Sequence, residues 1–471
     1  MGGMPRIGRC LGAGSRSLSI GRRRVLFSNL ILVCMSLGFM STAFSTVLAP
    51  VAADLQITLS QAQWLTSGYV LALAALTPLS AYLTSRFPTR RLYIAAVGSY
   101  ALMSAACAMS GHFGMLLTFR IAQACANALI ANVTQVSIMT LFEPSRRGRA
   151  MGWFGMTQGA AVLLGPVVGG VLTDALGWRS VFWVVAGVCA MGVIGALWLM
   201  KDLVSVNKSR LDVGDFLLSA CAMASLVLGL GLVITAPVLA LGVVVAALVL
   251  GGWFVRRQLR AQQQGKAPLL KVSLMAGPVF RAGGACSMLV YLVMMGSSAV
   301  LPLYAQTVDG LSASQAGLVV LPGALCMAVV APFAGRWFDR FGMRPLLVVG
   351  GTLLVVSNLA TCWAVFMSPW WAAAVNIIRT AGLAMLQMPL MTWANNSIDK
   401  TDLPHGSALI TALRNVAGSA GVAVFVSIME VAGALWGDTA GVAVSYGVMA
   451  LASGLLFIGL AGRFDRKTDQ S

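Results

Sequence analysis

The segment MGWFGMTQGAAVLLGPVVGGVLT, residues 151–173, guides the interpretation of the rest of this chain. It is apolar and long enough to cross a bilayer as a helix, which takes about 20 residues. Glycine costs about 1 kcal/mol and proline about 3 kcal/mol in a helix interior, so helix stability does not explain this composition. On a 3.6-residue period one face collects Gly152, Gly155, Gly159, Pro166 and Gly170, and the segment also holds Gly165 and Gly169.

That face predicts a groove that another helix can approach closely, with a bend at the proline. Two interpretations fit it. The small residues could simply allow tight packing between membrane helices, or the segment could be a flexible helix that changes its contacts as the protein works.

The composition indicates a polytopic membrane protein. The chain has 471 residues, of which 58% are hydrophobic and 10% charged, and its mean hydropathy is +0.86. A net charge of +18 could suggest nucleic-acid binding, but the basic residues lie in alternate loops, as membrane proteins place them. The nine cysteines form no CxxC pair, and His112 and His405 lie far apart. We therefore expect no metal, no cofactor and no nucleic-acid partner.

About fourteen apolar windows lie between residues 25 and 462, and an even number of spans puts both termini on the same side. The positive-inside rule places that side in the cytoplasm. With this orientation, the basic residues outside the tails and inner segments are Arg120, Arg179, Arg379 and Arg414, and of these only Arg179 falls in an outer loop.

The chain also repeats itself at an offset of 254 residues. Ser60-Gln61-Ala62, Pro78 and Arg86-Phe87 recur as 314–316, 332 and 340–341. Chance identity in low-complexity helices is the alternative to an internal repeat. Parallel six-span repeats are typical of one transporter architecture, whose substrate site lies at the midplane. The expected division is a basic tail (1–24), a six-helix bundle (25–200), linkers with an extra helix pair (201–281, the pair at about 214–255), a second six-helix bundle (282–462) and a tail (463–471).

The segment 332–344, PFAGRWFDRFGMR, places an acid and three bases at the turn after a span. Such charges can form bridges between two halves that exist in only one conformation. An ordinary positive-inside loop is the alternative, although two glycines flank the acid. The residues of this expected charge lock are Gly335, Arg336, Asp339, Arg340, Gly342 and Arg344.

Charged residues inside spans are candidates for function because burying one costs about 2.5–3.5 kcal/mol on insertion scales. Arg120 lies several residues inside its span, with Gln123 and Asn127 on the same helix, and Arg379 is its counterpart in the second half. Arg414 could instead extend to the cytoplasmic surface.

Glu430 is the one acid that falls within a span. It could bind and release a proton, or it could be an interfacial residue that reaches the outer surface. Trp64 and Tyr69 could line an apolar cavity, because aromatic rings suit lipophilic and cationic ligands, although lipid contact or core packing explains each ring alone.

Together these features resemble the major facilitator superfamily, and specifically its fourteen-span drug/proton antiporter branch. The basic motif of that branch's fourth span is matched by Arg120 and Gln123, with Ala124 in place of a glycine. The resemblance covers nearly all of the chain from 25 to 462. Its matching segments are 151–170 (the antiporter motif, with Ala161 in place of a glycine), 174–182, 301–324 and 406–424.

Two departures limit what the resemblance implies. In the first-half copy of the charge-lock motif, Ala81, Ser85 and Pro88 stand where Gly, Asp and Gly are usual, whereas the second-half copy is complete. The first span reads STAFSTVLAP at 41–50 and lacks the acid that relatives usually carry there. Neither a first-half bridge nor a proton-carrying acid in the first span is therefore implied.

The resemblance implies an all-α polytopic membrane protein with two six-helix bundles and an extra central helix pair. It implies secondary active efflux of lipophilic or cationic drugs and metabolites, by proton antiport with alternating access. The setting would be a bacterial inner membrane, with substrate, protons and lipid as partners. Protonation of Glu430 would alternate with substrate binding, and Arg120 would tune the site. The segment 151–173 would seal the halves on the side opposite the inner loops.

No GxxxxGK[ST] segment is present, so we expect neither ATP-driven transport nor enzymatic activity. One rival function is an exporter or facilitator of a single endogenous solute. Another is a membrane scaffold or sensor that kept the fold but does not transport.

Overall fold

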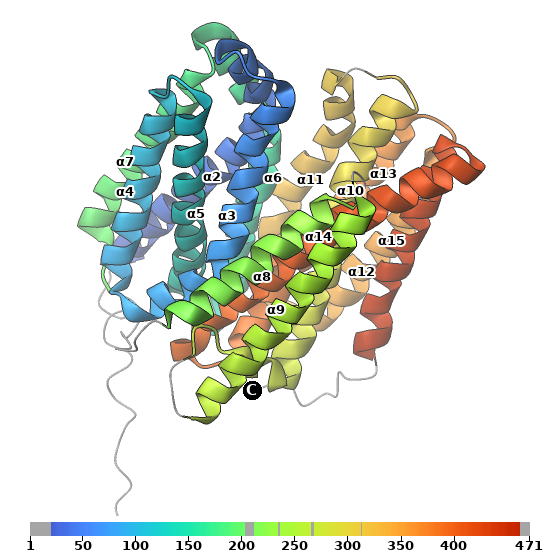
Figure 1. The fold of residues 1–471 in the computed structure, drawn as a ribbon. Coiled ribbons are helices and arrows are strands. Elements are labelled where there is room, and N and C mark those ends of the chain that lie inside the picture. The colour runs from blue at the N-terminus through green and yellow to red at the C-terminus, as the bar shows by residue number, and fades with distance from the viewer. Residues whose placement is uncertain (1–19, 203–211, 234–235, 265–267, 312, 462–471) are drawn as a thin grey trace, which may run out of the picture.

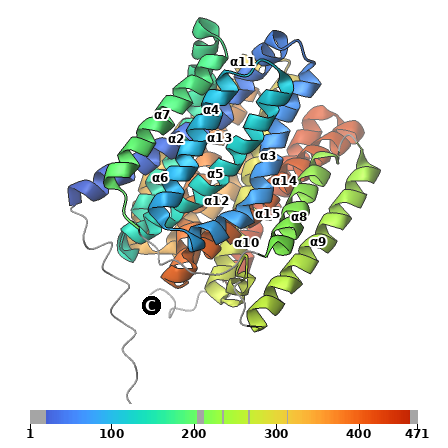
Figure 2. The same cartoon turned by 60° about the vertical axis from the view of Figure 1, so that its left-hand side comes forward.

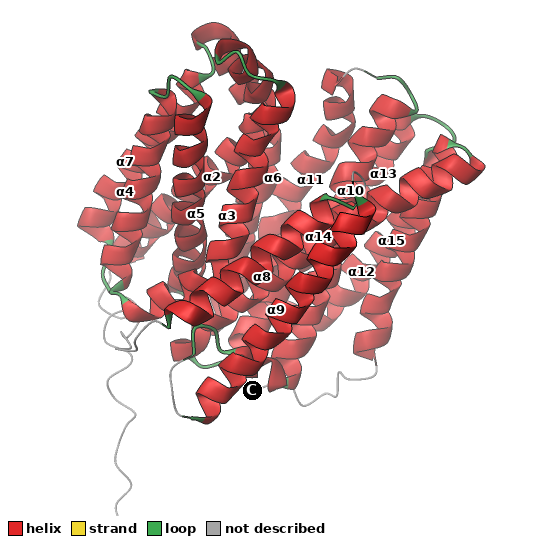
Figure 3. Ribbon diagram, in the orientation of Figure 1, coloured by secondary structure: helices red, strands yellow, loops and turns green. Residues whose placement is uncertain are grey.

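The computed structural model describes residues 20–202, 212–233, 236–264, 268–311 and 313–461, so most of the expected 1–24 tail and all of the expected 463–471 tail lie outside the described residues. Within these ranges the chain forms helices and short loops and contains no strand (Figure 3). The α-helices are α2 (Ile20–Asp54), α3 (Leu59–Arg86), α4 (Thr89–Ala108), α5 (Phe113–Leu141), α6 (Pro144–Leu176), α7 (Arg179–Leu199), α8 (Val213–Gly231), α9 (Pro237–Gln263), α10 (Pro278–Thr307), α11 (Ala313–Phe341), α12 (Met343–Ala364), α13 (Pro369–Asn396), α14 (Leu403–Trp436) and α15 (Asp438–Ala461). The short 3-10 helices η1 (Val272–Ala276) and η2 (Lys400–Asp402) precede α10 and α14.

Local sequence signals explain where several helices begin and end. Thr58 and Gln61 form a capping box at the start of α3, and the side chain of His112 accepts a hydrogen bond from the Met115 N–H at the start of α5. Gly177 ends α6 and Gly437 ends α14, each with a positive φ that glycine adopts at no steric cost.

Eleven helices in the described residues are long and apolar enough to cross a membrane, and the number is twelve when the two bent parts of α6 count as one span. The sequence led us to expect about fourteen spans. Helices α13 and α15 are not among these candidates. Helix α13 buries Asn376, Arg379 and Gln387 inside the protein, so part of its polarity faces other helices rather than lipid.

The helices form two groups with a further pair beside them (Figure 1). Helices α2 to α7 make up one group and α10 to α15 the other. The groups meet along two lines, where α6 packs on α11 and α3 packs on α14.

Helix α8 lies against both α3 and α14, and α9 covers its outer side (Figure 2). At one end of this pair, the Asp215 carboxylate lies 2.6 Å from Arg257 Nε and accepts a hydrogen bond of 2.8 Å from Gln258 Nε2. Gln258 in turn accepts a bond from the Leu270 N–H (3.3 Å), which ties the pair to the following linker.

The two groups are joined by hydrogen bonds at one end of the molecule. We call this the basic end; it contains the starts of α2, α4 and α6, and the ends of α11 and α13. In the described part of the chain, all the hydrogen bonds between the two groups lie there. Arg147 donates to Asn396 Oδ1 (2.7 Å), and Asn132 donates to the Pro404 carbonyl (3.4 Å). Toward the opposite, far end the groups lean apart (Figure 1).

The first part of α6 packs across the groups. A Cβ atom on Gly152 would lie 2.5 Å from the Ala331 carbonyl oxygen, and one on Gly159 would lie 2.6 Å from the Ala328 nitrogen, both in α11. A Cβ atom on Gly155 would lie 2.8 Å from Met388 in α13. Glycine is therefore required for this approach.

The second part of α6 packs within its own group, which differs in two ways from the arrangement that the sequence predicts. A Cβ atom on Gly165 would lie 2.0 Å from Thr42 Oγ1, and one on Gly169 would lie 2.7 Å from Ala43 Cβ, whereas Gly170 has nothing within 4 Å. Gly170 therefore does not extend the groove that Gly152, Gly155 and Gly159 form, because α6 bends by 45° between Pro144–Ala161 and Leu164–Leu176, the part that contains Pro166. The contact of α6 with the other group also lies toward the basic end, not on the side opposite the inner loops.

We expect Gly152→Ala to push the two groups apart at the basic end. Overpacking costs about 1–3 kcal/mol, equivalent to a five- to 150-fold change in the balance of two arrangements. Spin labels at positions 146 and 400, both exposed and in different groups, would report longer distances in this variant. Gly170→Ala is the control, since its Cβ atom meets nothing within 4 Å. Unchanged distances in Gly152→Ala would contradict the interpretation.

At the far end, an ion pair fastens the first group internally. Arg179 Nη1 donates to Asp54 Oδ2 (2.7 Å), and Trp178 Nε1 donates to the same oxygen (3.1 Å). Arg179 also bonds the Ser110 carbonyl (3.2 Å). The bonds from Arg179 and Trp178 hold the pKa of Asp54 below its usual value.

Acidification should therefore break the ion pair between Asp54 and Arg179. A lowered pKa in the folded state means that the pairing is complete above the ordinary carboxyl value near 3.9, and is lost as the pH falls through the lowered value. A spin label at exposed Leu176 should become more mobile in that acidic range. Asp54→Asn should show the mobile spectrum at every pH; a titration that persists in Asp54→Asn would assign it to another group.

Candidate functional site

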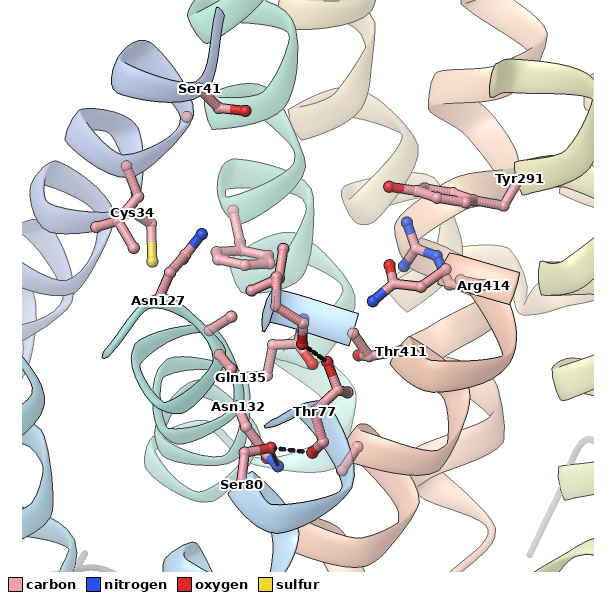
Figure 4. Close-up of a pocket in the computed structure, with 18 of the residues that line it drawn as sticks. Cys34, Ser41, Thr77, Ser80, Asn127, Asn132, Gln135, Tyr291, Thr411 and Arg414 are labelled. Carbon is pink, nitrogen blue, oxygen red and sulfur yellow. Dashed lines mark hydrogen bonds between the residues drawn. The ribbon is translucent and has the colours of Figure 1, made fainter. Parts of the chain in front are cut away.

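A cavity of about 260 Å³ lies between the two groups of helices (Figure 4). Helices α2, α3, α5 and α6 line it from one group, and α10, α13 and α14 from the other. Its lining residues are Cys34, Leu37, Gly38, Ser41, Leu73, Thr77, Ser80, Asn127, Ala128, Ala131, Asn132, Gln135, Phe154, Tyr291, Met388, Ala408, Thr411, Arg414 and Asn415.

Arg414 supplies the charge of this cavity. Its side chain is 7% exposed, and its guanidinium carbon lies 4.5 Å from the centre of the Tyr291 ring. Nη1 lies 3.6 Å from Met391 Sδ, which is a weak acceptor. Figure 4 shows Arg414 and Tyr291 on the opposite side of the cavity from Cys34 and Asn127. The sequence left open whether Arg414 extends to the surface, and the structure buries it instead.

The first group contributes amides and hydroxyls. Asn132 Nδ2 donates to Ser80 Oγ (2.9 Å), whereas Asn132 Oδ1 and Gln135 Oε1 are buried with no hydrogen-bond partner in the described residues. Asn127 Nδ2 donates to Tyr69 Oη (2.7 Å). Buried polar atoms without a partner are costly, so these oxygens are available to a ligand or to water.

Arg120 lies behind this wall rather than in it. Its guanidinium packs between Phe44 and Tyr69, with centroid distances of 4.1 and 4.4 Å. Nη1 donates to Gln123 Oε1 (2.8 Å), and Gln123 donates to Ser104 Oγ (2.8 Å). The path from Arg120 to the cavity therefore runs through Tyr69 and Asn127.

Arg379 occupies a comparable place in the second group. Nη1 donates to Tyr446 Oη (2.8 Å), and Nη2 donates to Asn376 Oδ1. Like Arg120, Arg379 is buried, contacts an aromatic ring and an amide on its own helix, and does not line the cavity.

Two further candidates from the sequence lie outside the cavity, on exposed surface. Glu430 is exposed on α14 near the far end, and Trp64 is 50% exposed on α3. Neither is a lining residue, and no described lining residue is acidic. Both therefore fit the alternatives of surface or lipid contact, because the inward face of each helix is taken by other residues.

The expected charge lock forms differently from the prediction. Asp339 Oδ1 accepts a hydrogen bond from the Gly148 N–H and Oδ2 accepts one from the Arg149 N–H, both at 2.7 Å. The partner of the acid is thus backbone near the start of α6, where a helix favours negative charge. A side chain at Gly148 would exclude this contact, since its Cβ atom would lie 2.5 Å from Asp339 Oδ1.

The basic residues of the motif do not bridge the groups. Arg336 and Arg340 lie over the rings of Phe333 and Phe341, and Arg344 is exposed. Gly335 allows the close approach of α11 to Gly148, and Gly342 has a positive φ at the start of α12. The four ion pairs between described residues are Arg179–Asp54, Arg257–Asp212, Arg257–Asp215 and Lys271–Asp402, and none joins the two groups.

Asp339→Asn should weaken closure at the basic end. The amide would lose the charge and place an NH2 group against one of the two N–H donors. Hydrogen bonds to charged groups contribute about 1.5–3 kcal/mol, or roughly a ten- to 150-fold shift toward separation. Amide hydrogen exchange of residues 144–150 should accelerate accordingly. Asp399→Asn, an exposed acid near the same end, is the control and should leave exchange unchanged. Equal exchange in both variants would refute the lock.

The sequence identified Arg414 and Asn127 as candidates but missed Thr411, Asn415 and Gln135, which line the cavity beside them. Thr411, Arg414 and Asn415 follow an i, i+3, i+4 spacing, which places them on one face of an otherwise apolar helix. Asn127 and Gln135, two turns apart on α5, line the cavity in the same way. That spacing was the available signal, but it does not show which face meets the cavity.

Comparison with known proteins agrees with this architecture. Residues 29–424 match the family model of the Major Facilitator Superfamily. The lincomycin resistance protein LmrB of Bacillus subtilis (strain 168) is 30% identical, covering 83% of this chain and 82% of that protein. The riboflavin transporter RibZ of Clostridioides difficile (strain 630) is 26% identical, covering 84% and 87%. The structure of the proton:xylose symporter XylE is similar with a TM-score of 0.66 at 15% identity, covering 93% and 96%.

Proposed function

The chain belongs to the major facilitator superfamily, a family of transporters rather than enzymes, and we propose that it exports lipophilic drugs or metabolites by alternating access. The observation that carries the proposal is the position of the cavity. It lies between two groups of helices whose mutual hydrogen bonds, among the described residues, all lie at one end. Separation at that end and closure at the other would expose the same cavity to the opposite side of the membrane.

The topology of the proposal has fourteen spans. Helices α2 to α7 and α10 to α15 are the two six-helix units, α8 and α9 are the extra pair, and the basic end faces the cytoplasm. In this assignment the described conformation is closed toward the cytoplasm. The contacts that the α6 glycines make with the other group, and the hydrogen bonds of Asp339, are then broken and formed again once per cycle.

Export rather than uptake is supported by the kind of relative that the chain resembles over most of its length. The name of LmrB states resistance to lincomycin, and another relative, from Streptomyces glaucescens, is named a tetracenomycin C resistance and export protein. The mixed lining of this cavity, with Leu37, Leu73, Phe154 and Met388 beside amides and hydroxyls, suits lipophilic compounds with polar groups.

We propose that the proton-motive force drives export. One charge that moves through about 100 mV releases about 2.3 kcal/mol, which supports roughly a 50-fold gradient. Proton antiport through Glu430 loses support, because that carboxyl lies outside the cavity lining. Arg120 keeps a proposed role in tuning the site through Tyr69 and Asn127.

An exporter or facilitator of one endogenous solute is the second candidate, and the similarity to RibZ favours it. A scaffold or sensor that does not transport has no observation in its favour beyond the missing acids.

Proteoliposomes test these functions directly. The purified protein would be given a panel of radiolabelled lipophilic drugs, together with riboflavin, under an imposed pH gradient or an imposed potential. We expect uptake of several drugs that depends on at least one of the two gradients, and none in empty liposomes. Transport of riboflavin alone would favour the single-solute function, and no transport of any compound would favour the scaffold. Gradient-independent movement would remove active export.

A further inference from the structure

We propose that the cavity is selective for lipophilic organic anions and that Arg414 binds their negative charge. This inference rests on the proposed function, because it names the substrate class of the same cavity. It departs from the cationic drugs that the resemblance of the sequence suggests.

The cavity lining carries a positive charge. Arg414 is the one charged residue among the described residues that line the cavity, so the fixed charge there is positive. A cationic ligand would need a carboxylate or an aromatic cage to replace its hydration. The two aromatic rings of the lining are Phe154 and Tyr291, and the face of Tyr291 is already occupied by the Arg414 guanidinium.

The Arg414 guanidinium has hydrogen-bond donors that no described residue accepts from. A guanidinium carries five N–H donors, arranged to match a carboxylate or sulfonate. Within the described part of the chain, its hydrogen bonding is limited to the sulfur of Met391, and no acid forms an ion pair with it. Arg414 is 7% exposed and borders the cavity, so an anion in the cavity would balance its charge and fill its free donors.

The residues around Arg414 are polar, and they line the cavity with it. Thr411 and Asn415 lie on the same face of α14 and also line the cavity, so hydroxyl and amide donors accompany the guanidinium. Apolar residues complete the opposite part of the lining, including Leu37, Leu73 and Phe154. An amphiphilic anion would place its charged group at α14 and its apolar body toward the first group.

A second buried arginine adds to the positive electrostatic potential of the cavity. Arg120 is buried one layer behind the lining, where its guanidinium contacts Tyr69, and it forms no ion pair with a described acid. Charges buried at low dielectric act over longer distances than charges in water. Arg120 thus adds to the positive potential that Arg414 gives the cavity, and both disfavour a cation.

For an anionic substrate, the membrane potential alone can supply the free energy of export. In a cell whose interior is negative, the potential itself drives an anion outward, and each ~59 mV supports a tenfold gradient for a single charge. Export of a monoanion therefore needs no protonatable carboxyl in the cavity, which agrees with the lack of one among the described lining residues.

A matched pair of probes tests the proposal. Naphthalene sulfonate and naphthyl trimethylammonium share one ring system and carry permanent charges of opposite sign. We expect the protein in proteoliposomes to transport the sulfonate at least tenfold faster than the ammonium, and an imposed potential to drive it. Arg414→Gln should reduce this ratio at least tenfold, whereas Arg414→Lys should keep the preference for the anion. Arg256→Gln removes an exposed positive charge on α9 and should change nothing.

Equilibrium binding to purified protein provides an independent readout. Saturable sulfonate binding that is lost in a monodisperse Arg414→Gln variant supports the inference even if no compound is transported, a result that would defeat only the proposed function. Transport of the ammonium at an equal or higher rate would overturn the inference and leave export intact. Sulfonate binding that is unchanged in Arg414→Gln would also overturn it.

Discussion

The close approach of α6 and α11 at the basic end is the contact on which this conformation depends. A Cβ atom on Gly335 would lie 2.0 Å from the Gly148 carbonyl oxygen, so the two backbones touch where no side chain separates them. Only at that separation can the Asp339 carboxylate reach two N–H groups of α6. Backbone contact and charge are thus interdependent, and the pair can be complete or absent but has few intermediate forms. Such a contact suits a protein that switches between two arrangements.

Much of the fold follows from elementary features of the sequence. The apolar windows and the alternating basic loops anticipate the helices and their alternating directions, because a helix in lipid must satisfy its own backbone. The glycines of α6 predicted close packing against another helix. The helical period separates Gly165 and Gly169 from the predicted face, but it could not show which helices each set meets or that Gly170 meets none, because both depend on the bend of α6.

The candidate site was harder to predict, and its arginines show why. Arg120 and Arg379 were identified as buried, but periodicity does not distinguish a cavity wall from the layer behind it. Arg414 and Glu430 lie on the same helix, sixteen residues apart. One lines the cavity and the other is exposed, because the orientation of α14 is set by α3, α10 and α15, which are distant in sequence. The positions of the two charges along the helix therefore could not show which of them lines the cavity.

The pair α8 and α9 makes the two lines along which the groups meet unlike each other. Because α8 rests on both α3 and α14, one of the two lines along which the groups meet is shielded from the surrounding lipid, while no further pair of described helices covers the line between α6 and α11. A compound dissolved in the bilayer therefore faces two unlike flanks, one screened by added helices and one closed by glycine contact. Sideways entry from the membrane is restricted on both, and the far end is left as the approach to the cavity in this conformation.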